Sequence, residues 1–301
     1  MTTQRKIQLA ILSFIPVLLI VGFYFLVTID TSEEEVFIEV AEVAVVVEPE
    51  PFVVYGTIGS SVEQREIEVV TFGHGDTHLL FVGGMHGGYE WNSSLLAYGM
   101  IEHLEENPDF LPEDLTMSII PVLNPDGLFK VTETSGKFTI GAVPDPSVRV
   151  AEARFNANDV DLNRNFDCKW APESTWRGNV VSAGTGAFSE PEAAALRDYV
   201  ATFQPKAVAF WHSKANNVYA SECEDGVLPE TLTLMDTYAT AGSYGAVPSF
   251  DAYPVTGDAE GWLASIGIPA VTVELESPTS IEWTRNLAGV EAVLELYSLA
   301  K

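Results

Sequence analysis

Apolar runs of strand length alternate with longer segments of helical periodicity over most of this 301-residue chain. The pattern predicts strands and helices in an order that is typical of a mixed sheet covered by helices. No internal repeat and no Pro/Gly-rich break follows residue 55, so we expect one large α/β domain over residues 55–301. The predicted strands are 67–72, 79–84, 116–123, 206–212 and 270–275, and the predicted helices are 90–106, 190–203, 229–242, 259–266 and 285–299.

Side chains suited to metal binding lie next to two of these strands. His86 follows the run 79–84, Glu90 opens the helix after it, and His212 ends the run 206–212. Open α/β sheets place their sites at the carboxyl ends of strands. Two histidines and a carboxylate with an open fourth position are the ligands of a catalytic zinc site, whereas structural sites are closed and usually rich in cysteine. Two cysteines are too few for such a closed site.

Two further strings carry a group suited to binding a substrate carboxylate and a group suited to acting as a base. Asp161-Leu162-Asn163-Arg164-Asn165-Phe166 contains a guanidinium, which can form two parallel hydrogen bonds to a carboxylate. Glu274 ends the apolar run 270–275, so we expect its carboxylate to point from the strand into a cleft.

In chain order, five strings resemble those of zinc metallocarboxypeptidases of the carboxypeptidase A superfamily, and the resemblance runs from about Gly56 to the C-terminus. It implies a central twisted mixed β-sheet flanked by helices and one Zn²⁺ per chain. The strings are Gly-Ser-Ser-Val-Glu-Gln-Arg at 59–65, Asn-Pro-Asp-Gly at 124–127, the Asp-Leu-Asn-Arg-Asn-Phe segment at 161–166, His-Ser at 212–213 and Val-Glu-Leu at 273–275.

The resemblance also implies the catalytic groups. His86, Glu90 and His212 would be the zinc ligands, and Glu274 the general base that activates a zinc-bound water. Arg154 is the candidate for stabilising the oxyanion, with Arg149 as the alternative.

The substrate in this family is a peptide with a free C-terminal carboxylate. By resemblance, Asn163 and Arg164 grip that carboxylate, and this contact makes the enzyme an exopeptidase. Tyr253 matches a mobile tyrosine that caps the substrate; the alternative is a packed surface aromatic on a turn. Glu260 matches the residue that reads the C-terminal side chain, and an acid there, or Asp258 instead, favours terminal Lys, Arg or diamino acids.

One departure concerns the first two ligands. The family spaces them as His-x-x-Glu, whereas this chain reads His86-Gly87-Gly88-Tyr89-Glu90. Two consecutive glycines can absorb the extra residue in a tight loop. Alternatively, Glu90 only opens a helix, where the dipole favours an acid. That alternative motivates a hypothesis of another class, a zinc-free pseudoenzyme that binds peptides.

The first 29 residues predict a membrane anchor. Arg5 and Lys6 precede an uncharged stretch at 7–29, and a helix over 7–27 would be ~32 Å long, enough to span the lipid core. The charge distribution places the N-terminus inside and the rest of the chain outside. A cleaved secretory signal is the alternative. Residues 30–54, acidic and rich in proline and valine, predict a linker.

The net charge of −28 argues against a nucleic-acid partner, which needs clustered Lys and Arg. It favours solubility, or steering of cationic peptides as the alternative. Cys168 and Cys223 form either a disulfide, which an outside location permits, or two buried free thiols.

These observations lead to a first hypothesis of a membrane-anchored, outward-facing zinc carboxypeptidase that acts on peptides, with a preference for basic C-terminal residues. Within the same superfamily, the alternatives are a cell-wall peptide amidase that cleaves near diaminopimelate and a small-molecule amide deacylase.

Overall fold

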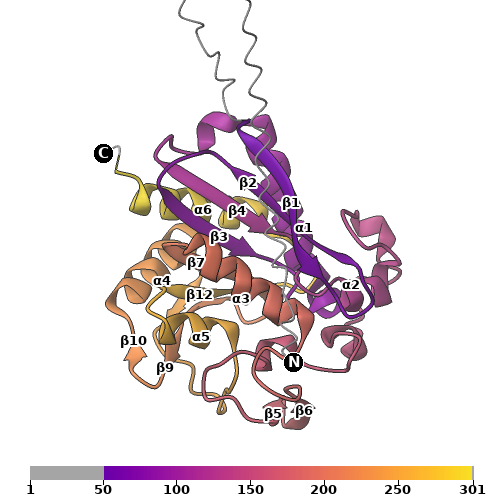
Figure 1. The fold of residues 1–301 in the computed structure, drawn as a ribbon. Helices are drawn as coiled ribbons and strands as arrows, with labels where there is room; N and C mark the ends of the chain where they lie inside the picture. Colours follow the sequence, from indigo (N-terminus) through magenta and orange to yellow (C-terminus); the bar gives the residue numbers. More distant parts are fainter. Residues whose placement is uncertain (1–50, 300–301) are drawn as a thin grey trace, which may run out of the picture. The chain divides into compact units, whose positions relative to one another are not determined.

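An eight-stranded mixed sheet forms the centre of the domain in the computed structural model, which describes residues 51–299. The strand order is β1-β2-β4-β3-β7-β12-β8-β11. Figure 1 labels β1 to β4, β7 and β12 of this sheet. The strands of this sheet are β1 (Val53–Ser60), β2 (Glu66–Phe72), β3 (Thr77–Val82), β4 (Leu115–Ile120), β7 (Ala207–Ser213), β8 (Asn217–Ala220), β11 (Gly245–Val247) and β12 (Ala270–Leu275).

The middle of the sheet is parallel, because β4, β3, β7 and β12 run in one direction. Antiparallel pairing of β1 with β2, β2 with β4, and β8 with β12 makes the sheet mixed. All residues of β7 are buried, as expected for a strand covered on both faces. The carboxyl ends of the central strands therefore lie at the same edge of the sheet.

Two apolar layers cover the sheet. One cluster joins the sheet to α1 (Trp91–Glu106), α2 (Pro125–Thr132), α4 (Pro229–Gly242) and α6 (Trp283–Tyr297). The other joins its opposite face to α3 (Pro191–Phe203) and α5 (Ala259–Ser265). The predicted α/β architecture, with a mixed sheet flanked by helices, is confirmed.

The predicted long elements match the structure closely. The helix expected at 229–242 is α4, and the strand expected at 270–275 is β12. The pattern did not predict β1, α2 or several short strands. The short hairpins are β5 (Glu173–Trp176) with β6 (Asn179–Ser182), and β9 (Glu222–Cys223) with β10 (Gly226–Val227).

The predicted membrane span at 1–29 and most of the predicted linker at 30–54 lie outside the described residues. Within residues 51–299, no helix combines the length and apolar character needed to cross a membrane. β1 begins at Val53, two residues before the predicted start of the catalytic domain.

Candidate active site

The loop that connects β3 to α1 carries the first two predicted ligands. Its extra residue is accommodated in a 3-10 turn over Gly87–Glu90. Gly87 has a φ of +47°, and a Cβ there would lie 2.7 Å from the Gly127 backbone in α2. A Cβ on Gly88 would lie 2.5 Å from Val131 Cγ2. Both glycines therefore permit close packing on α2, and the turn brings the Glu90 carboxylate back beside His86.

The three predicted ligands converge on one point. Nδ1 of His86 and Nδ1 of His212 each lie 3.0 Å from Oε2 of Glu90. The two Nδ1 atoms are 3.1 Å apart. All three residues are buried, and they come from the β3–α1 loop and from the end of β7.

This triangle fits a zinc ion. Ligand atoms about 2.0–2.2 Å from a tetrahedral zinc lie roughly 3.3 Å apart, close to the separations found here. One divalent cation would satisfy three buried polar atoms that face one another. We conclude that His86, Glu90 and His212 form a His-Glu-His metal site suited to zinc.

A carboxylate backs each ligand histidine. His86 Nε2 lies 3.5 Å from Asp161 Oδ1, and His212 Nε2 lies 3.5 Å from Glu260 Oε1. Such pairs fix the orientation of the imidazole and raise its basicity as a ligand. Glu260 also accepts a hydrogen bond of 2.9 Å from Thr272 Oγ1. The residue expected to read the substrate side chain therefore also contacts a metal ligand.

Glu274 lies beside His212, because the two residues are paired in register between the parallel strands β12 and β7. Burial, followed by the negative charge of Glu90, raises the pKa of Glu274 to about 7. Oε2 of Glu274 is buried without a hydrogen-bond partner within residues 51–299. A carboxylate with these surroundings is poised to exchange a proton near neutral pH.

The two candidate arginines take different positions. Arg149 Nη2 donates to Glu90 Oε1 at 3.1 Å and to the Ser213 carbonyl at 2.8 Å, so it holds the Glu90 oxygen opposite the one that contacts the two histidines. Arg154 is buried and donates from Nε to Asp161 Oδ2 at 2.8 Å. Its Nη atoms form no hydrogen bond within residues 51–299, and Arg154 lines the cleft.

The Arg154–Asp161 pair also affects ionisation. Burial opposes the charge on Asp161, but the charge of Arg154 together with His86 and Arg164 outweighs this cost and keeps the pKa of Asp161 far below its ordinary value. Asp161 is therefore a carboxylate at all physiological pH values. Arg164, in contrast, pairs with no carboxylate among the described ion pairs, so it remains available to an anionic ligand.

Asn163 and Arg164 lie in the turn after Asp161. Asn163 Oδ1 accepts a hydrogen bond of 2.9 Å from the Ala259 amide at the start of α5, which leaves its Nδ2 group to donate elsewhere. Arg164 Nη2 donates to the Thr175 carbonyl at 3.3 Å, and its Nε is buried without a partner within the described part of the chain. Both side chains keep donors for a carboxylate.

Apart from the buried Asp161, the functional side chains described above line one cleft of about 710 Å³ at the carboxyl ends of the central strands. Tyr253 contributes to its wall and packs edge-on against Phe250, with the ring centroids 4.8 Å apart. The nine residues that the sequence predicted for the site line this cleft, namely His86, Glu90, Arg154, Asn163, Arg164, His212, Tyr253, Glu260 and Glu274.

Other cleft residues were not predicted from the sequence. Tyr89 and Trp176 pack edge to face with ring centroids 5.1 Å apart, and Arg177 Nη1 donates to the Tyr89 hydroxyl at 3.2 Å. Tyr219 of β8 lies opposite Thr272 of β12 and also lines the cleft. For Tyr89 the available signal was its position directly before Glu90. The hairpin residues carry no comparable signal.

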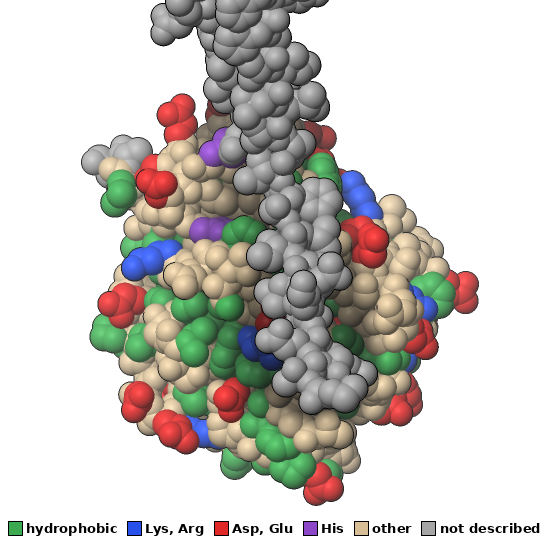
Figure 2. Space-filling model, viewed as in Figure 1, with side chains coloured by type: hydrophobic (Ala, Val, Ile, Leu, Met, Phe, Trp, Pro, Cys, Tyr) green, Lys and Arg blue, Asp and Glu red, His purple; other side chains and the backbone are tan. Residues whose placement is uncertain are grey.

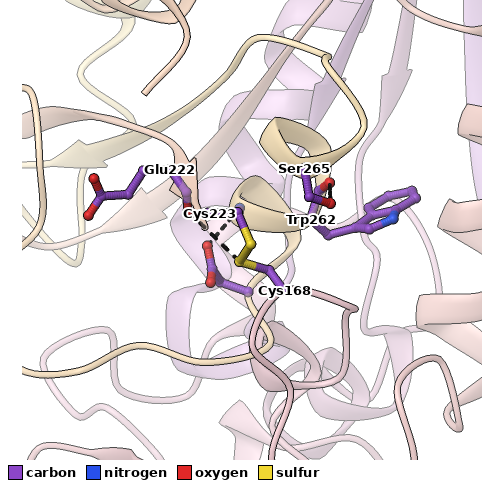
Figure 3. Close-up of a disulfide and its surroundings, with 7 residues drawn as sticks. Cys168, Glu222, Cys223, Trp262 and Ser265 are labelled. Atoms are coloured by element: carbon purple, nitrogen blue, oxygen red, sulfur yellow. Dashed lines mark hydrogen bonds between the residues drawn. A yellow bond between two sulfur atoms is a disulfide. The ribbon is translucent and has the colours of Figure 1, made fainter. Parts of the chain in front are cut away.

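Cys168 and Cys223 form a disulfide, so the alternative of two free thiols is wrong. Figure 3 shows the bond beside α5, whose residues Trp262 and Ser265 are labelled. A Cβ on Gly261 would lie 2.9 Å from Cys168 Sγ, which means that the disulfide packs directly on the first turn of α5. The bond thus links the segment after Arg164 to the β9–β10 hairpin and supports the helix that carries Glu260.

Comparison with known proteins agrees with this geometry. A family model described as zinc carboxypeptidase matches residues 44–281. Gamma-D-glutamyl-L-diamino acid endopeptidase 1 of Lysinibacillus sphaericus is 26% identical over 252 residues, which cover 76% of this chain and 62% of the relative. Carboxypeptidase B of Helicoverpa zea is 27% identical over 250 residues, which cover 74% of this chain and 56% of the relative.

Among solved structures, murein-tripeptide amidase from Escherichia coli O157 superimposes with a TM-score of 0.60 at 22% sequence identity. The match covers 82% of this chain and 93% of the amidase chain. At this identity the likeness establishes a common fold. The chain spans less than two thirds of the length of the Lysinibacillus and Helicoverpa relatives.

Proposed function

Because this chain belongs to the zinc carboxypeptidase family, we propose that it is a zinc-dependent exopeptidase that hydrolyses the C-terminal bond of peptides. The chain is a hydrolase of that family. The observation that carries the exopeptidase assignment is that Asn163 and Arg164 share one cleft with the metal triad and Glu274. A clamp for a terminal carboxylate beside a hydrolytic centre restricts cleavage to the end of a chain.

The chemistry follows from the groups that face the triad. Zinc bound by His86, Glu90 and His212 would polarise the scissile carbonyl and acidify a water molecule. Glu274 takes the proton of the attacking water and delivers it to the leaving amine nitrogen. Arg154, whose Nη1 also lies 3.9 Å from Glu90 Oε1, donates from its Nη groups to the oxygen on which negative charge develops.

Substrate orientation depends on the clamp. The Arg164 guanidinium and the Asn163 amide donate hydrogen bonds to the C-terminal carboxylate, and Tyr253 covers the bound residue. Charge-assisted hydrogen bonds of this kind are worth about 1.5–3 kcal/mol each. An amidated peptide should therefore react about 10–100-fold more slowly than the free acid, measured as kcat/KM. Equal rates for the two forms would contradict the clamp.

For specificity, we propose a preference for basic C-terminal residues. Asp258 and Glu260 line the same cleft, and acids there favour cationic side chains. A panel of N-acylated dipeptides ending in Lys, Phe, Glu or diaminopimelate tests this preference. Faster cleavage of the Phe substrate, together with an unchanged profile in Glu260→Gln, would overturn it. Zinc content must be measured in that variant, because Glu260 contacts His212.

A second candidate substrate is supported by two relatives. One is named for gamma-D-glutamyl-L-diamino acid bonds and another for murein tripeptides. A cell-wall peptide offers both a diamino acid for Asp258 and Glu260 and carboxylates for the basic side chains of the cleft. Faster hydrolysis of a gamma-D-glutamyl-diaminopimelate peptide than of any α-linked dipeptide would favour this amidase activity.

The hypothesis of a zinc-free pseudoenzyme makes a different prediction about zinc content. The separations of 3.0–3.1 Å among the three ligand atoms support metal binding. We expect one zinc per purified full chain after dialysis, measured by atomic absorption. A chain that holds no zinc and still binds peptides would instead support the zinc-free pseudoenzyme.

For location, we propose that residues 7–27 anchor the chain in a membrane and that the catalytic domain faces outward. The support is the long uncharged stretch after Arg5 and Lys6 together with the acidic residues that follow it. The disulfide also suits an oxidising compartment. Protease protection of the catalytic domain in intact cells, or its recovery without detergent, would contradict this arrangement.

A further inference from the structure

Positive charge is concentrated in the cleft of an otherwise acidic chain. The net charge is −28, and Figure 2 shows Asp and Glu side chains spread over the visible face. Six of the chain's 15 Lys and Arg residues nevertheless line this one cleft. They are Arg149, Arg154, Arg164, Lys169, Arg177 and Lys214.

Three of these six residues have contacts or proposed roles described above, and the other three do not. Arg149 binds Glu90, Arg154 binds Asp161, and Arg164 belongs to the carboxylate clamp. Lys169, Arg177 and Lys214 are exposed, and none of them takes part in an ion pair within residues 51–299. An exposed cation at a cleft wall without a carboxylate partner is free to bind an anionic ligand.

Arg177 is held in the best-defined position. It lies at the turn between β5 and β6, and its Nη1 donates to the Tyr89 hydroxyl at 3.2 Å. The Tyr89 ring is packed between Arg149, whose Cζ lies 3.7 Å from the ring centroid, and Trp176. Since Tyr89 directly precedes the zinc ligand Glu90, the hairpin places Arg177 beside the metal loop. One of its five N–H donors is used, and four remain.

The cleft has two chemically distinct ends. At one end, Asn163 binds the first turn of α5, which carries Glu260 just after Asp258. At the other end, Arg149 joins Tyr89 to the Ser213 carbonyl, and Lys214 follows Ser213. The metal triad contacts both ends, because His212 Nε2 lies 3.5 Å from Glu260 Oε1 and Glu90 Oε1 accepts a hydrogen bond of 3.1 Å from Arg149 Nη2. We call the second end, formed by Tyr89, Arg149, Arg177 and Lys214, the basic end.

We propose that the basic end is a subsite for a carboxylate on the residue that precedes the scissile bond, with Arg177 as its principal donor. The inference rests on the proposed function, because the clamp fixes the direction of the peptide. A substrate whose C-terminal residue occupies the clamp extends its preceding residue past the metal site into the basic end. The substrate class is therefore an acidic peptide, with Glu or Asp before the terminal residue.

The test uses matched substrates that differ by one charge. Acetyl-Glu-Lys and acetyl-Gln-Lys present the same terminal residue, so their ratio of kcat/KM isolates the carboxylate. We expect the full-length zinc enzyme to prefer the Glu substrate by about tenfold, the effect of one charge-assisted hydrogen bond near solvent. The preference should shrink as the salt concentration rises from about 0.05 to 0.5 M.

Variants then assign the effect to one side chain. Arg177→Gln should reduce the Glu-to-Gln ratio to within about twofold of one, and Arg177→Lys should give an intermediate ratio because a lysine cannot bind bidentately. Lys206→Gln is the matched control. It removes the same charge from an exposed position at the opposite end of β7, and it should leave the ratio as in the wild type.

The possible outcomes distinguish failure of the subsite from failure of the proposed function. A wild-type ratio near one, or a ratio that Arg177→Gln leaves unchanged, overturns the subsite while the exopeptidase function stands. Failure to cleave either dipeptide, with zinc bound, overturns the proposed function and the subsite with it. Thermal unfolding of each variant shows whether the fold is retained.

Discussion

Glu274 must be ionised to act as a base, yet its surroundings favour the neutral acid. Burial and the charge of Glu90 raise its pKa to about 7. The deprotonated form is the active one, so kcat/KM rises with pH through the pKa and levels off above it. A bound cation favours the carboxylate and moves this limb toward lower pH. We expect an acid limb centred at or just below about pH 7, and a flat profile from about pH 5 to 9 would contradict the role.

Substitution of the same residue separates chemistry from metal binding. Glu274→Gln keeps the shape of the side chain but removes its basicity. We expect kcat to fall by at least ~100-fold, while the zinc content stays at the wild-type level because Glu274 is not a ligand. Turnover like that of the wild type would remove Glu274 from the mechanism.

Asp161 tests the contribution of the carboxylates behind the ligands. Its Oδ1 faces His86 Nε2, and its Oδ2 is held by Arg154. Asp161→Asn removes the negative charge, and we expect the zinc affinity to fall about 10–100-fold in competition with a chromogenic chelator. Asp167→Asn is the matched control, because Asp167 is exposed in the segment that follows. Equal affinities in both variants would limit Asp161 to a structural role.

The sequence predicted those site residues whose chemistry depends on residue type and chain order. His86, His212 and Glu274 each follow or end an apolar run and Glu90 opens the next helix, so their positions near strand ends could be read directly. Arg177 could not be found in this way. Its position beside Tyr89 arises only when a short hairpin folds back across the cleft, and nothing in the local pattern encodes that contact.

Among the links between structural elements, the Cys168–Cys223 disulfide has the largest expected effect on stability. It closes a loop of 55 residues, and the chain-entropy model gives ~4 kcal/mol for such a loop. Replacing both cysteines with serine should lower the free energy of unfolding in urea by this order. Wild-type protein unfolded in the presence of reductant should approach the variant. If the urea midpoints of the serine variant and of the reduced wild type both equal that of the oxidised wild type, the disulfide contributes little to stability.

Length and periodicity account for many of the elements that the sequence predicted, although β1, with eight residues, was missed. The helix over 229–242 and the strand over 270–275 are long and periodic, and the structure has them at the predicted residues. β8 and β11 have four and three residues, and their stability comes from pairing with neighbours distant in sequence. α2 begins at Pro125, where the Asn124 side chain caps the Gly127 amide. The helix has only eight residues and a glycine in its first turn, so its apolar pattern is too short to stand out in the sequence.

For the whole molecule, zinc should act as a structural element as well as a cofactor. Its three ligands are buried and come from two distant segments, so an ion that binds only the folded chain stabilises it in proportion to RT ln(1 + [Zn]/Kd). Chelation with EDTA should therefore lower Tm by several degrees, and stoichiometric zinc should restore it. EDTA loaded with zinc beforehand is the control. A Tm that is indifferent to chelation would indicate that the triad does not hold the ion.

His212 and Glu274 occupy paired positions on β7 and β12, and each of these strands is hydrogen-bonded on both sides. Adjacent strands are spaced about 4.8 Å apart by the backbone alone. The sheet thus sets the distance between the proposed ligand His212 and the proposed base Glu274. This distance does not depend on the loops that line the cleft. Those loops lie in other segments, around 173–182 and 249–261. Substitutions there can alter which peptides are accepted while the dimensions of the hydrolytic centre stay constant, so specificity and chemistry can diverge independently within one domain.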